Sequence, residues 1–153
     1  MLDSKDKLIL DLLQRDASMP LNDIAERVGL SSTPCWRRIQ RLEQQGFIQA
    51  RVALLDRAKL NLGVTVFVSV RTAQHNQQWL AQFKKAIADI PEIIEAHRMS
   101  GSIDYLLQVV VPSIDDYDRV YQDLIEKLPF NDISSAFSME VMKSTTSLPT
   151  HYL

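Results

Sequence analysis

The sequence is poor in cysteine and has no long apolar run. Cys35 is the only cysteine among 153 residues, which excludes an internal disulfide and a metal site built from several cysteines. No apolar stretch approaches the roughly 20 residues that a membrane-spanning helix needs. No basic segment followed by an apolar core opens the sequence, so we expect a cytoplasmic protein that has no membrane partner.

The sequence also lacks the patterns of an enzyme active site or a metal centre. Its histidines have no cysteine partners and no i, i+4 pairing, and such pairing is what a helical zinc site needs. Aspartates crowd residues 115–118, where a helix is expected to begin and where carboxylates favour the helix dipole. Its few glycines stand at element boundaries, which leaves no glycine-rich phosphate loop. We therefore expect no catalytic residues, no metal and no cofactor.

The charge of the sequence is distributed unevenly. The formal net charge is −2, which by itself is not typical of a nucleic-acid-binding protein. Residues 31–51, however, hold four arginines and a single acid, Glu43. Screening limits the reach of distant charges to about 8 Å at physiological salt, so a local basic patch on an acidic protein can still bind DNA.

Residues 21–46 predict two helices joined by a tight turn. Apolar side chains at i, i+3, i+4 and i+7 predict the first helix, and Gly29 ends it because glycine enters the left-handed conformation without steric cost. Ser31 or Ser32 caps the second helix, and Pro34 fits its first turn. The apolar positions of the first helix are Leu21, Ile24, Ala25 and Val28.

The second helix is expected to bury one side and to present arginines on the other. At 100° per residue, Cys35, Ile39 and Leu42 face inward, and Arg37 and Arg41 face outward with Arg38 beside them. Arginine can bridge guanine or contact phosphate, so the pattern predicts a helix-turn-helix that binds double-stranded DNA. A solvated basic face on an ordinary helical hairpin is the alternative. The predicted DNA-binding residues are Ser31, Ser32, Thr33, Pro34, Arg37, Arg38 and Arg41.

Within this set the residue types suggest different contacts. Hydroxyls and free amides at the start of the helix can meet phosphate. We expect Arg37 and Arg41 to contact base edges and Arg38 to contact phosphate.

A further helix is predicted over residues 2–15, capped by Asp3 or Ser4, and it completes a three-helix domain over residues 1–50. The apolar segment 47–56 is expected to be extended, as a wing, a linker strand or both. We assign residues 51–63 to this linker strand and a short connection. The expected buried stripe of the first helix is Leu8, Ile9, Leu12 and Leu13.

From Val64 onward the apolar period changes from 3.6 to 2. Right-handed crossovers in a β-α-β-β-α-β order place both helices on one face of a four-stranded antiparallel sheet. The predicted fold class is therefore α+β, with a ferredoxin-like domain over residues 64–153 after the helix-turn-helix domain. The expected strands are residues 64–71, 93–99, 105–111 and 133–141, and the expected helices are residues 76–90 and 113–128.

The second face of this sheet would lack cover from its own chain. Phe67, Ala136 and Met142 are expected on that face, and the strand over residues 105–111 is apolar throughout. A soluble domain rarely exposes so much contiguous apolar sheet. A homodimer that packs sheet against sheet is the expected solution.

With these motifs in view, the sequence resembles the Lrp/AsnC, or feast/famine, family of transcriptional regulators along essentially its whole length. The resemblance implies dimers that assemble into a tetramer of dimers and bind amino acids or related metabolites near a Gly-x-x-Asp turn. Pro20 departs from the Ser or Thr cap of many relatives, which we expect to affect the cap alone. The matching motifs are VGLSSTPCWRRIQRLE at 28–43, GFI at 46–48, GSIDYLL at 101–107 and KSTTSLP at 143–149.

The resemblance places the effector site at residues 101–105. Gly101 allows a tight turn whose free amides can receive a carboxylate, and Asp104 can pair with an ammonium group. From the residues alone, Asp104 could instead cap its own turn. The predicted effector-binding residues are Gly101, Ser102, Asp104 and Tyr105, with Ser134 and Ser135 as weaker candidates.

The predicted function is a sequence-specific DNA-binding regulator whose DNA binding or assembly responds to an amino-acid effector. Two alternatives remain at this point. One is a nucleoid-type architectural protein that bends DNA with little sequence preference. The other is an amino-acid-sensing allosteric subunit of a metabolic enzyme, because the same β-α-β-β-α-β fold serves there.

Overall fold

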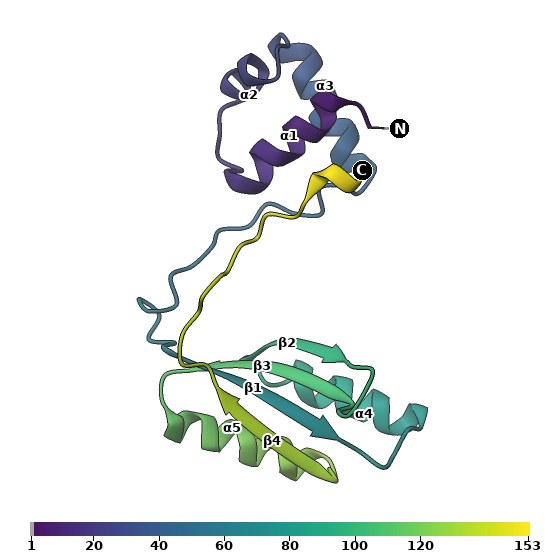
Figure 1. The fold of residues 1–153 in the computed structure, drawn as a ribbon, viewed down its shortest axis with the longest axis vertical. Helices are drawn as coiled ribbons and strands as arrows, with labels where there is room; N and C mark the ends of the chain where they lie inside the picture. Colours follow the sequence, from purple (N-terminus) through teal and green to yellow (C-terminus); the bar gives the residue numbers. More distant parts are fainter. Residues whose placement is uncertain (1) are drawn as a thin grey trace. The chain divides into compact units, whose positions relative to one another are not determined.

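A computed structural model describes residues 2–153, which form two compact units (Figure 1). The helical unit comprises Met1–Leu54 and Met142–Leu153, and the sheet unit comprises Leu55–Val141. The predicted domain boundary at the C-terminal side therefore differs from the packing of the chain. The tail of residues 142–153 belongs to the helical unit.

The helical unit contains α1 (Ser4–Arg15), α2 (Leu21–Arg27) and α3 (Ser32–Gln44). Asp3 is the N-cap of α1 and forms a reciprocal capping box with Asp6. The core is drawn from all three helices. The predicted stripe of α1 was too wide, because Leu8 is 40% exposed. The buried apolar residues are Ile9, Leu13, Ile24, Ala25, Val28, Cys35, Ile39 and Leu42.

The turn between α2 and α3 has the predicted form. Gly29 has a φ of 65°, which glycine tolerates, and the amide of Leu30 donates to the carbonyl of Ala25 at 2.9 Å. At the other end of α2, Pro20 is an N-cap without a side-chain hydrogen bond. The departure at Pro20 thus removes a cap and leaves the helix in place.

The linker differs from the prediction. Residues 51–56 have no regular secondary structure, and no strand stands between α3 and β1 in the described chain, residues 2–153. A strand needs a partner to accept its backbone hydrogen bonds, and the described chain offers none here. The apolar side chains of Val52, Leu54 and Leu55 are each at least 70% exposed.

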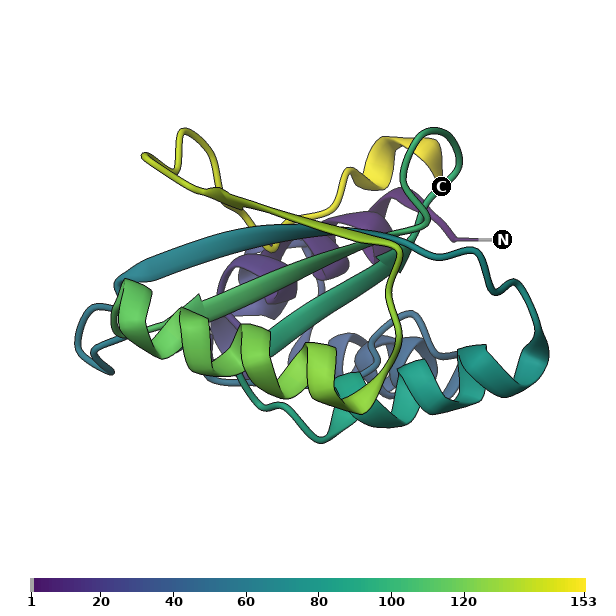
Figure 2. The same ribbon diagram turned by 90° about the horizontal axis from the view of Figure 1, so that it is seen from below.

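The sheet unit has the predicted β-α-β-β-α-β order. All pairings are antiparallel in the order β2-β3-β1-β4. Figure 2 shows α4 and α5 on the same side of this sheet. The elements are β1 (Val64–Arg71), α4 (Gln77–Ala88), β2 (Ile93–Arg98), β3 (Tyr105–Val111), α5 (Ile114–Lys127) and β4 (Asp132–Phe137).

One sheet face carries the core, and the other is open within this chain. Val66, Val68 and Val70 of β1 pack against the helices, while Phe67 on the opposite face is 38% exposed. The predicted last strand was too long, because β4 ends at Phe137 and not at Val141. Phe137 pairs with Val66 near the start of β1, so the later residues have few partner groups left.

The tail returns to α1. It ends in a short 3-10 helix, η1 (Thr150–Tyr152), next to α1 within the helical unit. Thr150 Oγ1 donates to Asp11 Oδ1 at 2.9 Å, and Lys7 Nζ donates to the carbonyl of Leu153. The last segment of the chain therefore forms part of the helical unit.

Within residues 2–153 we find no helix with the length and apolar character that crossing a membrane requires.

Candidate DNA-binding helix and ligand turn

Helix α3 buries the predicted side. Cys35, Ile39 and Leu42 are at most 5% exposed, and burial raises the pKa of the Cys35 thiol. Arg37 lies on the opposite side and is exposed. Arg37 takes part in no ion pair within residues 2–153. Its guanidinium therefore keeps its donors available.

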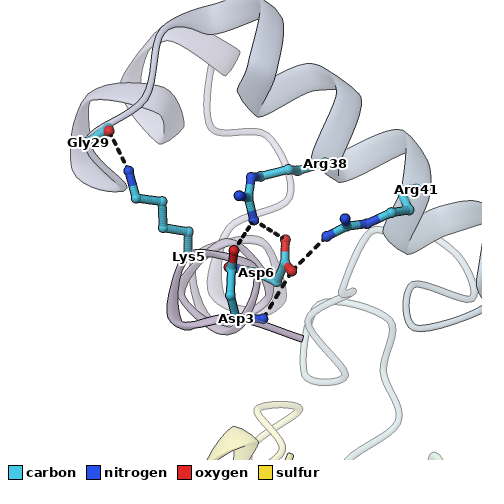
Figure 3. Close-up of polar contacts among 6 residues, drawn as sticks. All are labelled: Asp3, Lys5, Asp6, Gly29, Arg38 and Arg41. Atoms are coloured by element: carbon cyan, nitrogen blue, oxygen red, sulfur yellow. Dashed lines mark hydrogen bonds and ion pairs between the residues drawn. The ribbon is translucent and has the colours of Figure 1, made fainter. Parts of the chain in front are cut away.

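The other two arginines of α3 turn toward α1 and share one carboxylate there (Figure 3). Arg38 Nη1 lies 2.8 Å from Asp6 Oδ1 and 2.7 Å from Asp3 Oδ2. Arg41 Nη2 lies 2.6 Å from Asp6 Oδ2. The Asp6 side chain is only 2% exposed, whereas those of Arg38 and Arg41 are 27% and 47% exposed.

This arrangement corrects the prediction for Arg41, which does not simply face outward beside Arg37. Arg41 lies about 40° from Arg37 around the helix, toward Arg38, at 100° per residue, and its long side chain reaches α1. The hydrogen bonds that Arg38 donates to Asp3 and Asp6 raise its pKa. The Asp6 amide and the Arg38 guanidinium lower the pKa of Asp3.

The hydroxyl residues at the start of α3 differ from one another. Ser31 is the N-cap but makes no side-chain capping bond, so its hydroxyl is not used by the helix. Ser32 Oγ donates to Asn22 Oδ1 of α2 at 2.6 Å. Thr33 and Pro34 are exposed in the first turn. These residues lie around the N-terminus of α3.

The turn of residues 100–103 offers backbone donors. Gly101 has a φ of 119°, in the region that favours glycine. Within residues 2–153, the amides of this turn donate no hydrogen bond. Asp104, directly after the turn, accepts the Thr72 amide at 2.8 Å through Oδ2. Asp104 thus ties β3 to the end of β1 and does not cap its own turn.

Two predicted effector residues lie on the other side of the sheet. Tyr105 is 8% exposed, and its ring packs 4.5 Å from that of Phe83 in the core. Ser135 Oγ hydrogen-bonds the hydroxyl of Tyr117 on α5, and burial raises the pKa of Tyr117. Successive strand residues face opposite ways, so Ser134 lies on the open face while Ser135 does not. Tyr105 and Ser135 therefore do not join Gly101, Ser102 and Asp104.

Comparison with known proteins gives the family. The Lrp/AsnC ligand binding domain matches residues 65–148, and a winged helix-turn-helix DNA-binding domain matches residues 2–49. A glutamate uptake regulatory protein of Zymomonas mobilis is 49% identical over 148 residues, which cover 97% of this chain and 90% of the relative. The chain belongs to the Lrp/AsnC family. It is a DNA-binding transcriptional regulator with a ligand-binding domain.

Solved structures of Lrp/AsnC relatives agree with the fold. An AsnC family transcriptional regulator from Agrobacterium tumefaciens is 52% identical, with a TM-score of 0.96 and 99% of each chain covered. A transcriptional regulator from Neisseria meningitidis in complex with L-Met is 31% identical, with a TM-score of 0.95 and 99% of each chain covered. The ferredoxin-like prediction for the sheet unit is confirmed.

Sequence reasoning missed the acidic partners of the Lrp/AsnC recognition helix. Asp3 was considered only as a cap, and Asp6 was not considered. A usable signal was present, because a cap residue followed three positions later by a second carboxylate is the spacing of a capping box. That spacing identifies the start of α1, but it does not reveal which arginines approach it.

Proposed function

We propose that α3 reads operator DNA with Arg37 at a base edge and with Arg38 and Arg41 on the phosphate backbone. The observation that carries this assignment is the difference in pairing along one helix. Arg37 is exposed and unpaired within residues 2–153, whereas Arg38 and Arg41 each give a donor to Asp6. A free guanidinium can bridge guanine, while a partly engaged one has remaining donors for phosphate. Ser31 and Thr33 add donors at the start of the helix.

The test is Arg37→Ala on a duplex that the parent protein enriches from a random-sequence library. The variant should lose about 1–3 kcal/mol of binding free energy on that duplex and lose preference at one base position. Arg15→Ala removes the same charge at the end of α1 and is the matched control. Equal binding by the parent and Arg37→Ala would contradict the assignment of Arg37.

The same selection tests the architectural alternative. A sequence-specific regulator keeps its enriched duplex in the presence of excess nonspecific competitor, because specific sites bind roughly 10³- to 10⁷-fold more tightly. An architectural protein would lose it in proportion to the competitor added.

For the effector we infer an amino acid bound at residues 101–104. The free amides of the turn suit a carboxylate, and Asp104 Oδ1 is left for an ammonium group. Ser102 and Ser134 are the remaining candidates on the accessible side. The L-Met complex of the Neisseria relative supports this class of ligand.

A thermal-shift screen of the amino acids identifies the effector, because a ligand that binds only the folded state raises its melting temperature. Asp104→Asn then removes the charge and keeps an oxygen that can accept the Thr72 amide. The variant should lose the response while its own melting temperature changes little. If Asp104→Asn responds at the same concentration as the parent, the pocket lies elsewhere.

We further propose that the protein acts in the cytoplasm as a homodimer or a tetramer of dimers. The open face around Phe67 and the exposed apolar linker around Val52 support a partner of the same sequence.

A further inference from the structure

The carboxylate of Asp6 is the most deeply buried charged group near α3. Its residue is 1% exposed, and both of its oxygens are occupied. Oδ1 accepts from Arg38, and Oδ2 accepts from Arg41 and from the Asp3 amide at 3.2 Å. The capping box needs only the last of these contacts. The two arginines are therefore an addition to the helix start that capping does not explain.

A buried carboxylate must recover its lost hydration through close partners. Asp6 does so with two guanidinium groups, and each of them spends only part of its five donors on the carboxylates. The rest of each side chain remains partly exposed, by 27% for Arg38 and 47% for Arg41. Their flexible stems are thereby held in one geometry before any ligand arrives.

The charges add a second effect. Asp6 cancels one of the two positive charges that Arg38 and Arg41 bring to this side of α3. Nonspecific DNA affinity follows the number of phosphates that are neutralised. The carboxylate thus lowers the sequence-independent attraction, while it keeps the two guanidinium groups in fixed positions.

We propose that Asp6 is a positioning residue that sets the DNA specificity of this protein without touching DNA. Asp6 fixes the side chains of Arg38 and Arg41 in one position. From that position they contact DNA phosphates only when Arg37 lies against the base that it recognises. This inference rests on the proposed function, because it needs α3 to be the reading helix. It assigns a role in recognition to a residue of α1, outside the helix-turn-helix pair α2 and α3.

Asp6→Asn removes the charge at nearly constant shape and tests the inference in the full chain. Two duplexes are used: one that the parent protein enriches from a random-sequence library, and a shuffled duplex of the same composition. Affinity for the shuffled duplex should rise, and the plot of log K against log salt should steepen by about 0.9 for each phosphate gained. The ratio of specific to nonspecific affinity should fall about tenfold.

Glu43→Gln is the matched control, because it changes the net charge equally on α3 and releases Arg51 from an exposed ion pair. Its ratio should stay within about twofold of the parent ratio. Asp3→Asn is the second variant, since asparagine caps a helix as well as aspartate does. It loosens Arg38 alone and should lower the ratio in the same direction by a smaller factor.

The outcomes separate the inference from the function beneath it. If the parent does not distinguish the two duplexes, the proposed function fails. If the parent distinguishes them and Asp6→Asn keeps the same ratio, only the inference fails. A loss of affinity for both duplexes by the same factor would also overturn it, because that is the result of a purely structural role. If Asp6→Asn does not fold, an unchanged ratio in Asp3→Asn decides against the inference.

Discussion

Gln14 on α1 and Leu148 in the tail exchange two hydrogen bonds. The Leu148 amide donates to Gln14 Oε1 at 2.8 Å, and Gln14 Nε2 donates to the Leu148 carbonyl at 2.9 Å. One primary amide thus satisfies both backbone groups of a residue that belongs to no helix or strand. Leu148 and Leu153 also line a cleft with Leu10 and Leu13 of α1. The tail is held to α1 by polar and apolar contacts together.

Gln14→Ala should destabilise the helical unit by about 1–2 kcal/mol, because each lost hydrogen bond contributes about 1 kcal/mol. Urea unfolding followed by the fluorescence of Trp36 in a Trp79→Phe background measures this unit alone, since the sequence has two tryptophans. Gln82→Ala on the exposed side of α4 is the control and should leave the Trp36 transition unchanged. An unchanged transition in Gln14→Ala would mean that the tail does not stabilise α1.

The pKa of Asp3 predicts how acid weakens the same unit. This pKa is lower in the folded chain than the ordinary value of 3.8. Its carboxylate therefore stabilises the fold fully above that value, and the contribution is lost as the pH falls through the lower folded pKa. Between about pH 5 and pH 2.5, Asp3→Asn should lose less stability than the parent. Equal losses, measured by Trp36 fluorescence at each pH, would contradict a role for the Asp3 charge.

The neighbouring serines of β4 should behave differently. Ser135→Ala removes the partner of the part-buried Tyr117 hydroxyl and should cost about 1 kcal/mol of stability. Its response to an effector should match that of the parent. Ser134 is exposed on the open face, so the Ser134→Ala variant should be as stable as the parent. The effector concentration needed for half of its response should rise. Thermal unfolding with and without the effector measures the stability and the effector response of each variant. A stability loss in Ser134→Ala together with a weaker response in Ser135→Ala would contradict the assignment of the two serines to opposite faces.

Phe67→Glu tests whether a second copy covers the open sheet face. Phe67 lies opposite Gln108 and Ala136 and is 38% exposed in the single chain, so the variant should fold. A carboxylate in a sheet-to-sheet interface would lose its hydration without a partner. Sedimentation at micromolar concentration should give a dimer or larger species for the parent and a monomer for the variant. Thr65→Glu on the same face is a second probe, and unchanged assembly in both variants would place the interface elsewhere.

The fold could be predicted because its signals are local. The change of period at Val64 separates the helical domain from the domain that contains the strands, and Gly29 ends α2 where the sequence indicates. The limits of β4 were not local, because they depend on where its neighbour β1 begins. The prediction of a linker strand was wrong for the same reason, because a strand cannot form without a partner strand.

The site was harder to predict because it depends on approaches between distant residues. Helical periodicity gives the direction of Arg37, but the reach of the Arg41 side chain to Asp6 spans 35 positions of sequence. Alternation along β4 does separate Ser134 from Ser135. The sequence does not give the pairing register of β4. It therefore could not show whether Ser134 or Ser135 points toward the helices. No periodic pattern marks the tail, whose contacts with α1 depend on single side chains.

The path of the tail has a consequence for synthesis. The helical unit begins with α1 and is finished by residues that are translated only after the whole sheet unit has been made. A nascent chain can therefore form α1, α2 and α3 early. The hydrogen bonds of Gln14 with Leu148 and of Asp11 with Thr150 form only after the tail has been translated. A ribosome that stalls within the sheet unit releases a product with its arginine helix but without these contacts. The helical unit of such fragments is less stable, so proteases degrade them sooner than the full chain.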